Sequence, residues 1–415
     1  MPHIVVFSHL RWNFVFQRPQ HLLSRLALRY PVVFIEEPVR CEGPAWLEDS
    51  APMQGVRVLR PHTPVEAPGF HDDQLAILEP LIADWFAAEC IVDTIAWFYT
   101  PMALPLLQEL QPRAIVYDCM DELSAFKGAP RQMRQRETAL LKSAQLVLTG
   151  GLSLYEAKHS LNPNVLCLPS AVDAAHYAPA RATADAARVQ AAARLQGHVP
   201  APRLGFFGVI DERLDLALIA AIADADTAWN VVMVGPVVKI DPTTLPRRPN
   251  LHWLGQQSYD VLPQLLAGWD VALMPFALND STRFISPTKT LEYMAAGKPI
   301  VSTPIRDVVV SFGDVVAIAD DAPSFVTACR DALAETGADA EVRRVRMAAQ
   351  VAAYSWDDTA AQIAAAIEGC LAAAPLVRPK AALLAGDAGE RAPTAASLTP
   401  AHPGSAGVRA GAGSR

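Results

Sequence analysis

Residues 286–303 read SPTKTLEYMAAGKPIVST and contain the start and the end of one helix, followed by an apolar strand. Ser286 is a favourable N-cap, Pro287 fits the first helical position and Gly297 fits the C-terminal cap, so the sequence predicts a helix of about ten residues. The apolar run 299–303 is typical of a strand that is buried on both faces of a parallel sheet. This stretch therefore encodes one helix–strand unit of an α/β sheet.

The same alternation of apolar strands and helical patterns extends along most of the chain, in two series. The first series comprises 3–9, 32–36, 94–100, 114–118, 146–150 and 164–170, and the second comprises 203–208, 229–235, 250–255, 270–276, 299–303 and 315–320. Continuous apolar strands separated by helices are typical of parallel sheets covered on both faces. The sequence therefore predicts two open α/β sheets in tandem.

Composition changes along the chain predict where these units begin and end. The Ala-rich segment 173–202 is expected to be a linker with one helix near 182–196, and Ser355 is expected to cap a helix over 355–373. The Ala/Pro/Gly/Ser-rich text after residue 373 lacks periodicity and is predicted to be disordered. The expected division is 1–172, 173–202, 203–354, 355–373 and 374–415.

The composition, net charge and cysteine spacing of the chain exclude several classes of protein. The chain has 415 residues, of which 51% are apolar, and a net charge of −8, which argues against nucleic-acid binding. The six cysteines are scattered singly without metal-ligand spacing, so we expect no zinc site and reduced thiols in the cytoplasm. We identify no signal peptide, and the longest apolar runs are too short to span a bilayer.

Ligands of open parallel sheets bind at the carboxyl ends of the strands, which directs attention to the text after each strand. After the first strand, Gln17 and Arg18 belong to a polar cluster that also contains His9, Arg11 and Gln20. Arginine favours two-point binding of carboxylates and phosphates. The cluster is therefore either a ligand-binding loop or a solvated one. Its aromatic members, Trp12, Phe14 and Phe16, either pack in the core or form a rim that contacts lipid or a partner.

Acidic residues and glycines follow three further strands. Asp118 and Asp121 can bind sugar hydroxyls or act as a base, although Asp121 can equally cap a helix. Gly150 and Gly151 allow a close approach of backbone to ligand, or simply a tight turn. Gly208 suits a turn in which phosphate meets backbone N–H groups, and Arg213 can supply a cation. The pattern there is not GxGxxG, so no dinucleotide is inferred.

Lys289 and Glu292 lie three residues apart in the opening stretch and therefore point to one face of the predicted helix. As an exposed pair they would stabilise the helix by only a few tenths of a kcal/mol. Spacing alone favours a surface pair over a ligand-facing pair.

Four stretches together resemble a known family: SHLRWNFVFQRPQHL (8–22), GVIDERLD (208–215), GWDVALMPF (268–276) and RFISPTKTLEYMAAGKPIVST (283–303). They are similar to retaining, nucleotide-sugar-dependent glycosyltransferases of the GT-B fold with a Glu-x7-Glu motif, in particular to bacterial cell-surface polysaccharide enzymes of the teichuronic-acid type. The resemblance implies two Rossmann-like domains facing a cleft, an N-terminal one for the acceptor and a C-terminal one for the donor, and a crossover helix at 355–373.

The resemblance also implies roles for individual residues. Glu292 matches the second glutamate of the motif, which holds the nucleotide ribose, and Lys289 would lie near the diphosphate and sugar. Gly208 and Arg213 match the phosphate-binding region, and Gln17 with Arg18 matches the loop that faces donor and acceptor.

Two positions depart from the family pattern. The first glutamate of the motif would fall at Phe284, and Val209 stands where the family has an arginine. The donor sugar would then be contacted through Arg283, Asp280 or the turn at 284–287, in which Ser286 lies. Arg213, with Arg283, would replace the missing charge.

The expected reaction is transfer of a sugar from a nucleoside diphosphate sugar to a hydroxyl of a glycan or lipid-linked acceptor. Arg213 and Lys289 would stabilise the leaving diphosphate without a metal or other cofactor, and Asp118 or Asp121 would orient the acceptor. A cytoplasmic enzyme with peripheral contact at the inner membrane face is compatible with the aromatic loop. A nucleotide-sugar epimerase and a non-catalytic nucleotide-sugar-binding protein of the same fold remain alternatives.

Overall fold

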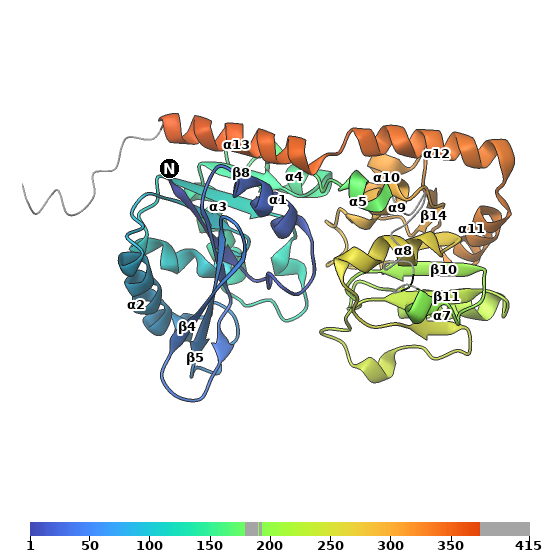
Figure 1. Ribbon diagram of the computed structural model, residues 1–415, viewed down its shortest axis with the longest axis horizontal. Helices are drawn as coiled ribbons and strands as arrows, with labels where there is room; N and C mark the ends of the chain where they lie inside the picture. The colour runs from blue at the N-terminus through green and yellow to red at the C-terminus, as the bar shows by residue number, and fades with distance from the viewer. Residues whose placement is uncertain (179–189, 191–192, 374–415) are drawn as a thin grey trace, which may run out of the picture. The chain divides into compact units, whose positions relative to one another are not determined.

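The computed structural model describes residues 1–178, 190 and 193–373, and shows two mainly parallel sheets with helices around them (Figure 1). The predicted helix at 182–196 lies largely outside the described residues, and the predicted disordered tail lies wholly outside them. The predicted α/β class with two tandem sheets is confirmed for the described part.

The N-terminal sheet has the strand order β3-β5-β2-β1-β6-β7-β8-β9, with β4 paired to β5. Its strands pair in parallel except β4, which is antiparallel to β5. The strands are β1 (His3–Ser8), β2 (Val32–Glu36), β3 (Val39–Arg40), β4 (Trp46–Met53), β5 (Val56–Thr63), β6 (Thr94–Phe98), β7 (Ala114–Cys119), β8 (Leu146–Thr149) and β9 (Val165–Cys167).

The C-terminal sheet is parallel throughout, in the order β12-β11-β10-β13-β14-β15. Its strands are β10 (Arg203–Phe207), β11 (Asn230–Val234), β12 (Leu251–Trp253), β13 (Val271–Met274), β14 (Ile300–Ser302) and β15 (Ala317–Ile318). Strand order reverses on either side of β10, as it does on either side of β1 in the first sheet. Such reversal points open a crevice at the carboxyl ends of the strands, where ligands bind.

Helices connect the strands of both sheets. The α-helices are α1 (Arg18–Leu26), α2 (Asp72–Ala88), α3 (Met133–Ser143), α4 (Leu152–Lys158), α5 (Ala174–Tyr177), α7 (Leu216–Ala225), α8 (Leu262–Ala267), α9 (Lys289–Ala295), α10 (Arg306–Phe312), α11 (Ala322–Ala334), α12 (Gly337–Ala352) and α13 (Trp356–Ala373). Short 3-10 helices are η1 (Pro101–Glu109), η2 (Leu123–Ala125), η4 (Pro242–Thr244) and η5 (Tyr259–Val261).

The last described helix returns to the first sheet. Trp356, Ile363 and Ile367 of α13 belong to the same buried cluster as Ile4 and Leu22. Figure 1 shows α13, in orange-red, beside α1 and β8, with which it makes contacts. An apolar stripe on α13 thus completes the core of the N-terminal half, as expected for an amphipathic helix. Within the described residues, no helix is both long and apolar enough to cross a membrane.

The hairpin β4–β5 was not predicted from the sequence. Most residues of β4 are exposed or half-exposed, so WLEDSAPM carries no apolar run. In β5 the buried residues Val56 and Val58 flank Arg57, and the strand contains Pro61, which is unusual within a strand. An edge hairpin with one solvated face lacks the continuous apolar signal of the inner strands.

Candidate functional site

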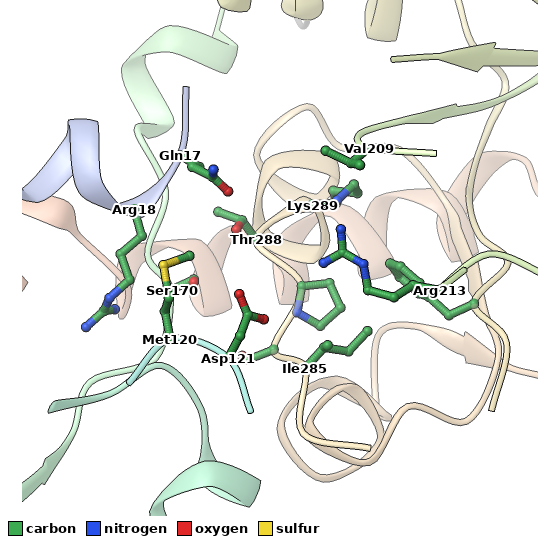
Figure 2. A pocket seen from close by; sticks show the side chains of 13 residues that line it. Gln17, Arg18, Met120, Asp121, Ser170, Val209, Arg213, Ile285, Thr288 and Lys289 are labelled. Atoms are coloured by element: carbon green, nitrogen blue, oxygen red, sulfur yellow. The ribbon is translucent and has the colours of Figure 1, made fainter. Parts of the chain in front are cut away.

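A polar pocket lies where residues from both halves of the chain converge (Figure 2). It is built from segments that follow β1, β7 and β9 in the first sheet and β10 and β13 in the second, together with the segment that leads into α9. The lining residues are Gln17, Arg18, Met120, Asp121, Ser170, Val209, Arg213, Phe276, Ile285, Ser286, Pro287, Thr288 and Lys289. Carboxyl ends of strands from both sheets therefore supply this pocket, as the rule for open α/β sheets predicts.

Lys289 is the first residue of α9 and brings a cation to the pocket. Its Nζ lies 5.4 Å from the ring centroid of Phe206 and 5.9 Å from that of Phe276. Within the part of the chain that the structure describes, it forms no hydrogen bond or ion pair. Burial, and then the neighbouring Arg213 charge, lower the pKa of Lys289 to about 8. A desolvated ammonium held by ring faces alone is available to an anionic ligand.

Gly208 makes room for the Lys289 side chain. Its φ of +142° lies in the region that favours glycine. A Cβ at this position would collide with Cε of Lys289. The turn after β10, predicted to meet phosphate, therefore sets the place of the lysine in this structure.

Arg213 supplies the second cation of the pocket, and Figure 2 shows it near Lys289. Its Nε donates to Asp211 Oδ1 at 2.9 Å, and its Nη2 donates to Oδ2 at 2.8 Å. Burial opposes the charge, but the two-point contact with Asp211 outweighs burial and raises the pKa of Arg213. The guanidinium stays charged, while its carboxylate partner fixes its orientation.

Asp121 lines the pocket from the segment that follows β7 of the first sheet. Burial raises the pKa of Asp121, with Arg213 acting in the opposite direction. The following helix η2 has Glu122 at its N-cap, so Asp121 does not cap it. Of the roles that the sequence left open for Asp121, helix capping is wrong.

Arg18 and Asp118 form a buried ion pair beside the pocket. Both are buried almost completely, with Nε of Arg18 3.0 Å from Oδ1 and 3.1 Å from Oδ2 of Asp118. Arg18 also donates to the carbonyl of Leu168 at 2.8 Å. Arg18 lines the pocket, whereas Asp118 is not part of the lining.

Gln17 also lines the pocket. It stands at the N-cap of α1, where its backbone N–H donates to the side-chain oxygen of Gln20 at 3.0 Å.

Glu292 lies behind Lys289 in the first turn of α9 and is only 7% exposed. Burial raises the pKa of Glu292 to about 7, although Lys289 and the Tyr177 hydroxyl act in the opposite direction. The surface-pair interpretation of Lys289 and Glu292 is therefore wrong, because both charges are desolvated and Lys289 lines the pocket.

The helix that carries these two residues is shorter than predicted. It begins at Lys289, with Thr288 at the N-cap, and spans seven residues. Ser286 and Pro287, predicted as N-cap and first helical residue, instead line the pocket as part of the preceding segment. Gly297 has a φ of +69° just beyond the helix, as expected of a glycine that ends a helix.

Several residues named from the family pattern lie outside the pocket lining, namely Gly208, Asp280, Arg283, Phe284 and Glu292. Arg283 is exposed, and its guanidinium lies 5.2 Å from the ring centroid of Phe284. Phe284 packs against the core of the N-terminal half. Gly151, by contrast, lies next to the pocket residue Ser286. A side chain at this position would collide with Ser286 and with Asp307.

Lys239 was missed by the sequence analysis. Its Nζ lies 5.1 Å from the ring centroid of Phe126, which Arg213 also approaches, at 5.7 Å. Lys239 also counters the effect of burial on the pKa of Asp121. No motif surrounds Lys239 in the sequence, and only the fold of the loop after β11 brings it close to Phe126.

Trp12, which the sequence analysis left as either a core residue or part of an exposed rim, is buried. It packs edge-on against Phe34, at 5.2 Å between ring centroids.

Known proteins resemble the chain in sequence and in fold. Residues 201–335 match the model of the family described as Glycosyl transferases group 1. This segment is a glycosyl transferases group 1 domain. The predicted enzyme class is confirmed at the level of this family. A curated relative from Bacillus subtilis (strain 168), "Putative teichuronic acid biosynthesis glycosyltransferase TuaH", is 27% identical over 283 residues, which are 64% of this chain and 71% of the relative.

Solved structures show the same fold over most of the chain. Sucrose-phosphate synthase from Thermosynechococcus elongatus matches with a TM-score of 0.67 at 15% identity, covering 90% of this chain and 100% of that one. Anabaena HepE in complex with UDP and glucose matches with a TM-score of 0.65 at 15% identity, covering 89% of this chain and 100% of that one. The predicted GT-B architecture is confirmed by these matches.

Proposed function

We propose that the chain transfers a sugar from a nucleoside diphosphate sugar to a hydroxyl of a glycan or lipid-linked acceptor. The observation that carries the proposal is Lys289, a desolvated cation without an ion-pair partner in the described part of the chain, placed in one pocket with Arg213. The group 1 domain at residues 201–335 contains both residues. A diphosphate would supply the negative charge that Lys289 lacks as a partner in the described part of the chain.

The two cations provide a physical basis for the chemistry. Sugar transfer releases a nucleoside diphosphate, and negative charge grows on the leaving oxygen in the transition state. Fixed positive groups that already face this oxygen lower the barrier, because they need no reorganisation during the reaction. Arg213 is oriented by Asp211, and Lys289 is held between Phe206 and Phe276. In this proposal neither a metal nor another cofactor is required.

The ribose would be bound by Glu292, whose carboxylate can accept hydrogen bonds from both ribose hydroxyls. On the acceptor side, Asp121 would orient the attacking hydroxyl, and Gln17 and Arg18 would contact donor or acceptor. Asp118 would act indirectly, by holding Arg18. Retention of the anomeric configuration is part of the proposal and rests on the family resemblance.

The donor sugar would be contacted differently from the family pattern. Phe284 packs against the core of the N-terminal half, so an apolar side chain stands where the motif has its first glutamate. Ser286 and the backbone of the turn at 284–287 line or adjoin the pocket, whereas Arg283 is exposed. We therefore assign the sugar contact to this turn, and a contact by Arg283 would require its side chain to move.

The relatives suggest the first substrates to test. The Bacillus subtilis relative is named for teichuronic acid biosynthesis, and the HepE structure contains UDP and glucose. We propose a role in cell-surface polysaccharide synthesis in the cytoplasm, with UDP-glucose as the first donor to test. Peripheral membrane contact would involve Phe14 and Phe16, which are 39% and 43% exposed, whereas Trp12 is buried. We further propose residues 1–172 as acceptor domain and 203–354 as donor domain.

Glu292→Ala should weaken UDP binding by about tenfold to a hundredfold at pH 8, where Glu292, with its pKa of about 7, is ionised. In the wild type, affinity should fall as the pH drops below 7, because protonation removes a lone pair from the carboxylate. In the variant this dependence should disappear. Titration calorimetry with UDP-glucose, whose diphosphate has no ionisation near pH 7, measures both effects.

Glu137→Ala is the matched control, because Glu137 is also 7% exposed but lies in the first half, with Tyr117 and Lys158 as partners. It should lower thermal stability and leave UDP-glucose affinity unchanged. Equal affinity of the wild type and Glu292→Ala would contradict the ribose assignment.

A further inference from the structure

Tyr177 lies where the chain passes from the first sheet to the second, on the short helix α5. It is fully buried, and α5 packs against α9, which carries Glu292. The ring is fixed on two sides: it stacks on Phe207 with centroids 6.4 Å apart and meets Tyr259 edge-on at 6.1 Å. The hydroxyl at the end of such a ring has a well-defined position.

The hydroxyls of Tyr177 and Tyr259 are both buried, and neither makes a hydrogen bond of regular geometry with the described residues, although Tyr177 lies close enough to Glu292 to affect the pKa of its carboxyl. A phenylalanine would provide the same ring packing without the cost of a buried, unpaired O–H group. Burial and then the Glu292 carboxyl raise the pKa of Tyr177 well above its usual value, and the same two causes raise that of Tyr259. The contact between α5 and α9 places Tyr177 beside the helix that carries Glu292, and the charge of Glu292 acts on both hydroxyls.

The groups around Glu292 come from three elements. Lys289 lies on the same helix, Tyr177 on α5 and Tyr259 on η5. Tyr293, the next residue of α9, is engaged elsewhere, because its hydroxyl accepts the backbone N–H of Phe207 at 3.1 Å. Of these hydroxyls, that of Tyr177 is the one that acts on Glu292 as a hydrogen-bond donor, while Lys289 lines the pocket.

We propose that Tyr177 is a positioning residue for the nucleotide ribose: its O–H donates to Glu292 and directs the remaining carboxylate lone pairs toward the 2′- and 3′-hydroxyls. Tyr259 in turn orients the Tyr177 hydroxyl. When the ribose fixes the Glu292 carboxylate, the distance between the Tyr177 hydroxyl oxygen and the carboxylate shortens to that of a regular hydrogen bond. Hydrogen bonds in active sites often tighten in this way when the ligand binds. The inference rests on the proposed function and adds a residue from the chain junction to its donor site.

Tyr177→Phe tests this inference, because it keeps the ring and removes only the hydroxyl. The dissociation constant for UDP-glucose should rise about tenfold at pH 7, as expected for a lost hydrogen bond to a charged group. The pH at which affinity begins to fall should move upward by about one unit, because a tenfold preference for the ionised form corresponds to one pKa unit. For the 2′,3′-dideoxy analogue of UDP, wild type and variant should bind equally.

Tyr117→Phe is the matched control, because it removes an equally buried hydroxyl, one bonded to Glu137 at 2.8 Å, and should leave UDP-glucose binding unchanged. Tyr259→Phe should cause a smaller loss, also confined to ligands that carry the diol. If Tyr177→Phe does not fold, a Tyr259→Phe variant with unaltered diol binding overturns the inference.

The outcomes separate the two proposals. If Glu292→Ala loses affinity but Tyr177→Phe binds UDP-glucose like the wild type, the inference is overturned and the proposed function stands. If Tyr177→Phe weakens the dideoxy analogue as much as UDP-glucose, Tyr177 is structural and the inference is again overturned. A wild-type chain that binds neither UDP nor UDP-glucose would contradict both the choice of nucleotide and this role for Tyr177.

Discussion

Lys289→Met should lower the rate of nucleotide-sugar turnover by about a hundredfold to a thousandfold, the usual effect of removing one preorganised group that stabilises charge in a transition state. Methionine keeps the apolar stem between Phe206 and Phe276 and removes only the ammonium. Release of UDP from UDP-glucose, measured at saturating donor, gives the rate. A rate within threefold of the wild type would exclude Lys289 from the diphosphate site.

The same substitution should raise the melting temperature at pH 7. The folded-state pKa of Lys289, lowered to about 8, lies below its unfolded value of about 10.4, so folding the protonated lysine costs free energy at neutral pH. This cost is fully present below pH 8 and fades as the pH rises toward the unfolded pKa. Thermal unfolding at pH 7 and pH 10 should therefore show a stabilising effect of Lys289→Met that shrinks with pH.

Lys298→Met is the control for both effects. Burial also lowers the pKa of Lys298, but its ammonium donates to the carbonyls of Ala267 at 2.9 Å and Trp269 at 2.6 Å. Removing these bonds should lower stability and leave turnover unchanged. If Lys298→Met matched Lys289→Met in turnover, general damage to the domain would explain both.

Asp118→Asn should lower the free energy of unfolding by about 3–5 kcal/mol, the usual cost of leaving one member of a buried ion pair without its counter-charge. Arg18 is only 1% exposed, so water cannot replace the lost carboxylate. Urea unfolding followed by far-UV circular dichroism measures the loss.

A double variant separates the ion pair from simple packing. Arg18→Met combined with Asp118→Asn removes both charges, so it should recover part of the stability lost in Asp118→Asn. Donor binding should stay reduced, because Arg18 lines the pocket. A loss below 1 kcal/mol in Asp118→Asn would show that Arg18 finds other compensation.

The inner strands could be predicted because burial on both faces leaves a continuous apolar run, as in VVFIE of β2 and WNVVMVG around β11. The hairpin β4–β5 could not, because β4 is exposed or half-exposed throughout and half-buried polar residues interrupt the buried residues of β5. The start of α9 was placed too early because Ser286 and Pro287 are favourable helix-start residues, while in this structure they form a wall of the pocket.

Candidate site residues could be predicted where they follow a strand closely, as Asp121 follows β7 and Arg213 follows β10. Lys289 could be predicted because it lies at the start of a helix whose preceding segment begins at the end of β13. It was not predictable where partners are distant in sequence and carry no motif. Tyr177 meets Glu292, and Asp307 accepts the backbone N–H of Ser153 at 3.1 Å, only because of the way the chain folds. The pairing of Arg18 with Asp118 is another contact between remote positions that spacing alone does not encode.

Thermal unfolding of the wild type and Lys289→Met against a panel of nucleosides, nucleoside diphosphates and nucleoside diphosphate sugars tests the central claim most directly. A ligand at a hundred times its dissociation constant stabilises the native state by about 2.7 kcal/mol. We expect at least one nucleoside diphosphate and its sugar to raise the melting temperature of the wild type by several degrees, with little shift in Lys289→Met. No shift with any diphosphate, or equal shifts in both proteins, would contradict a diphosphate-sugar site at Lys289.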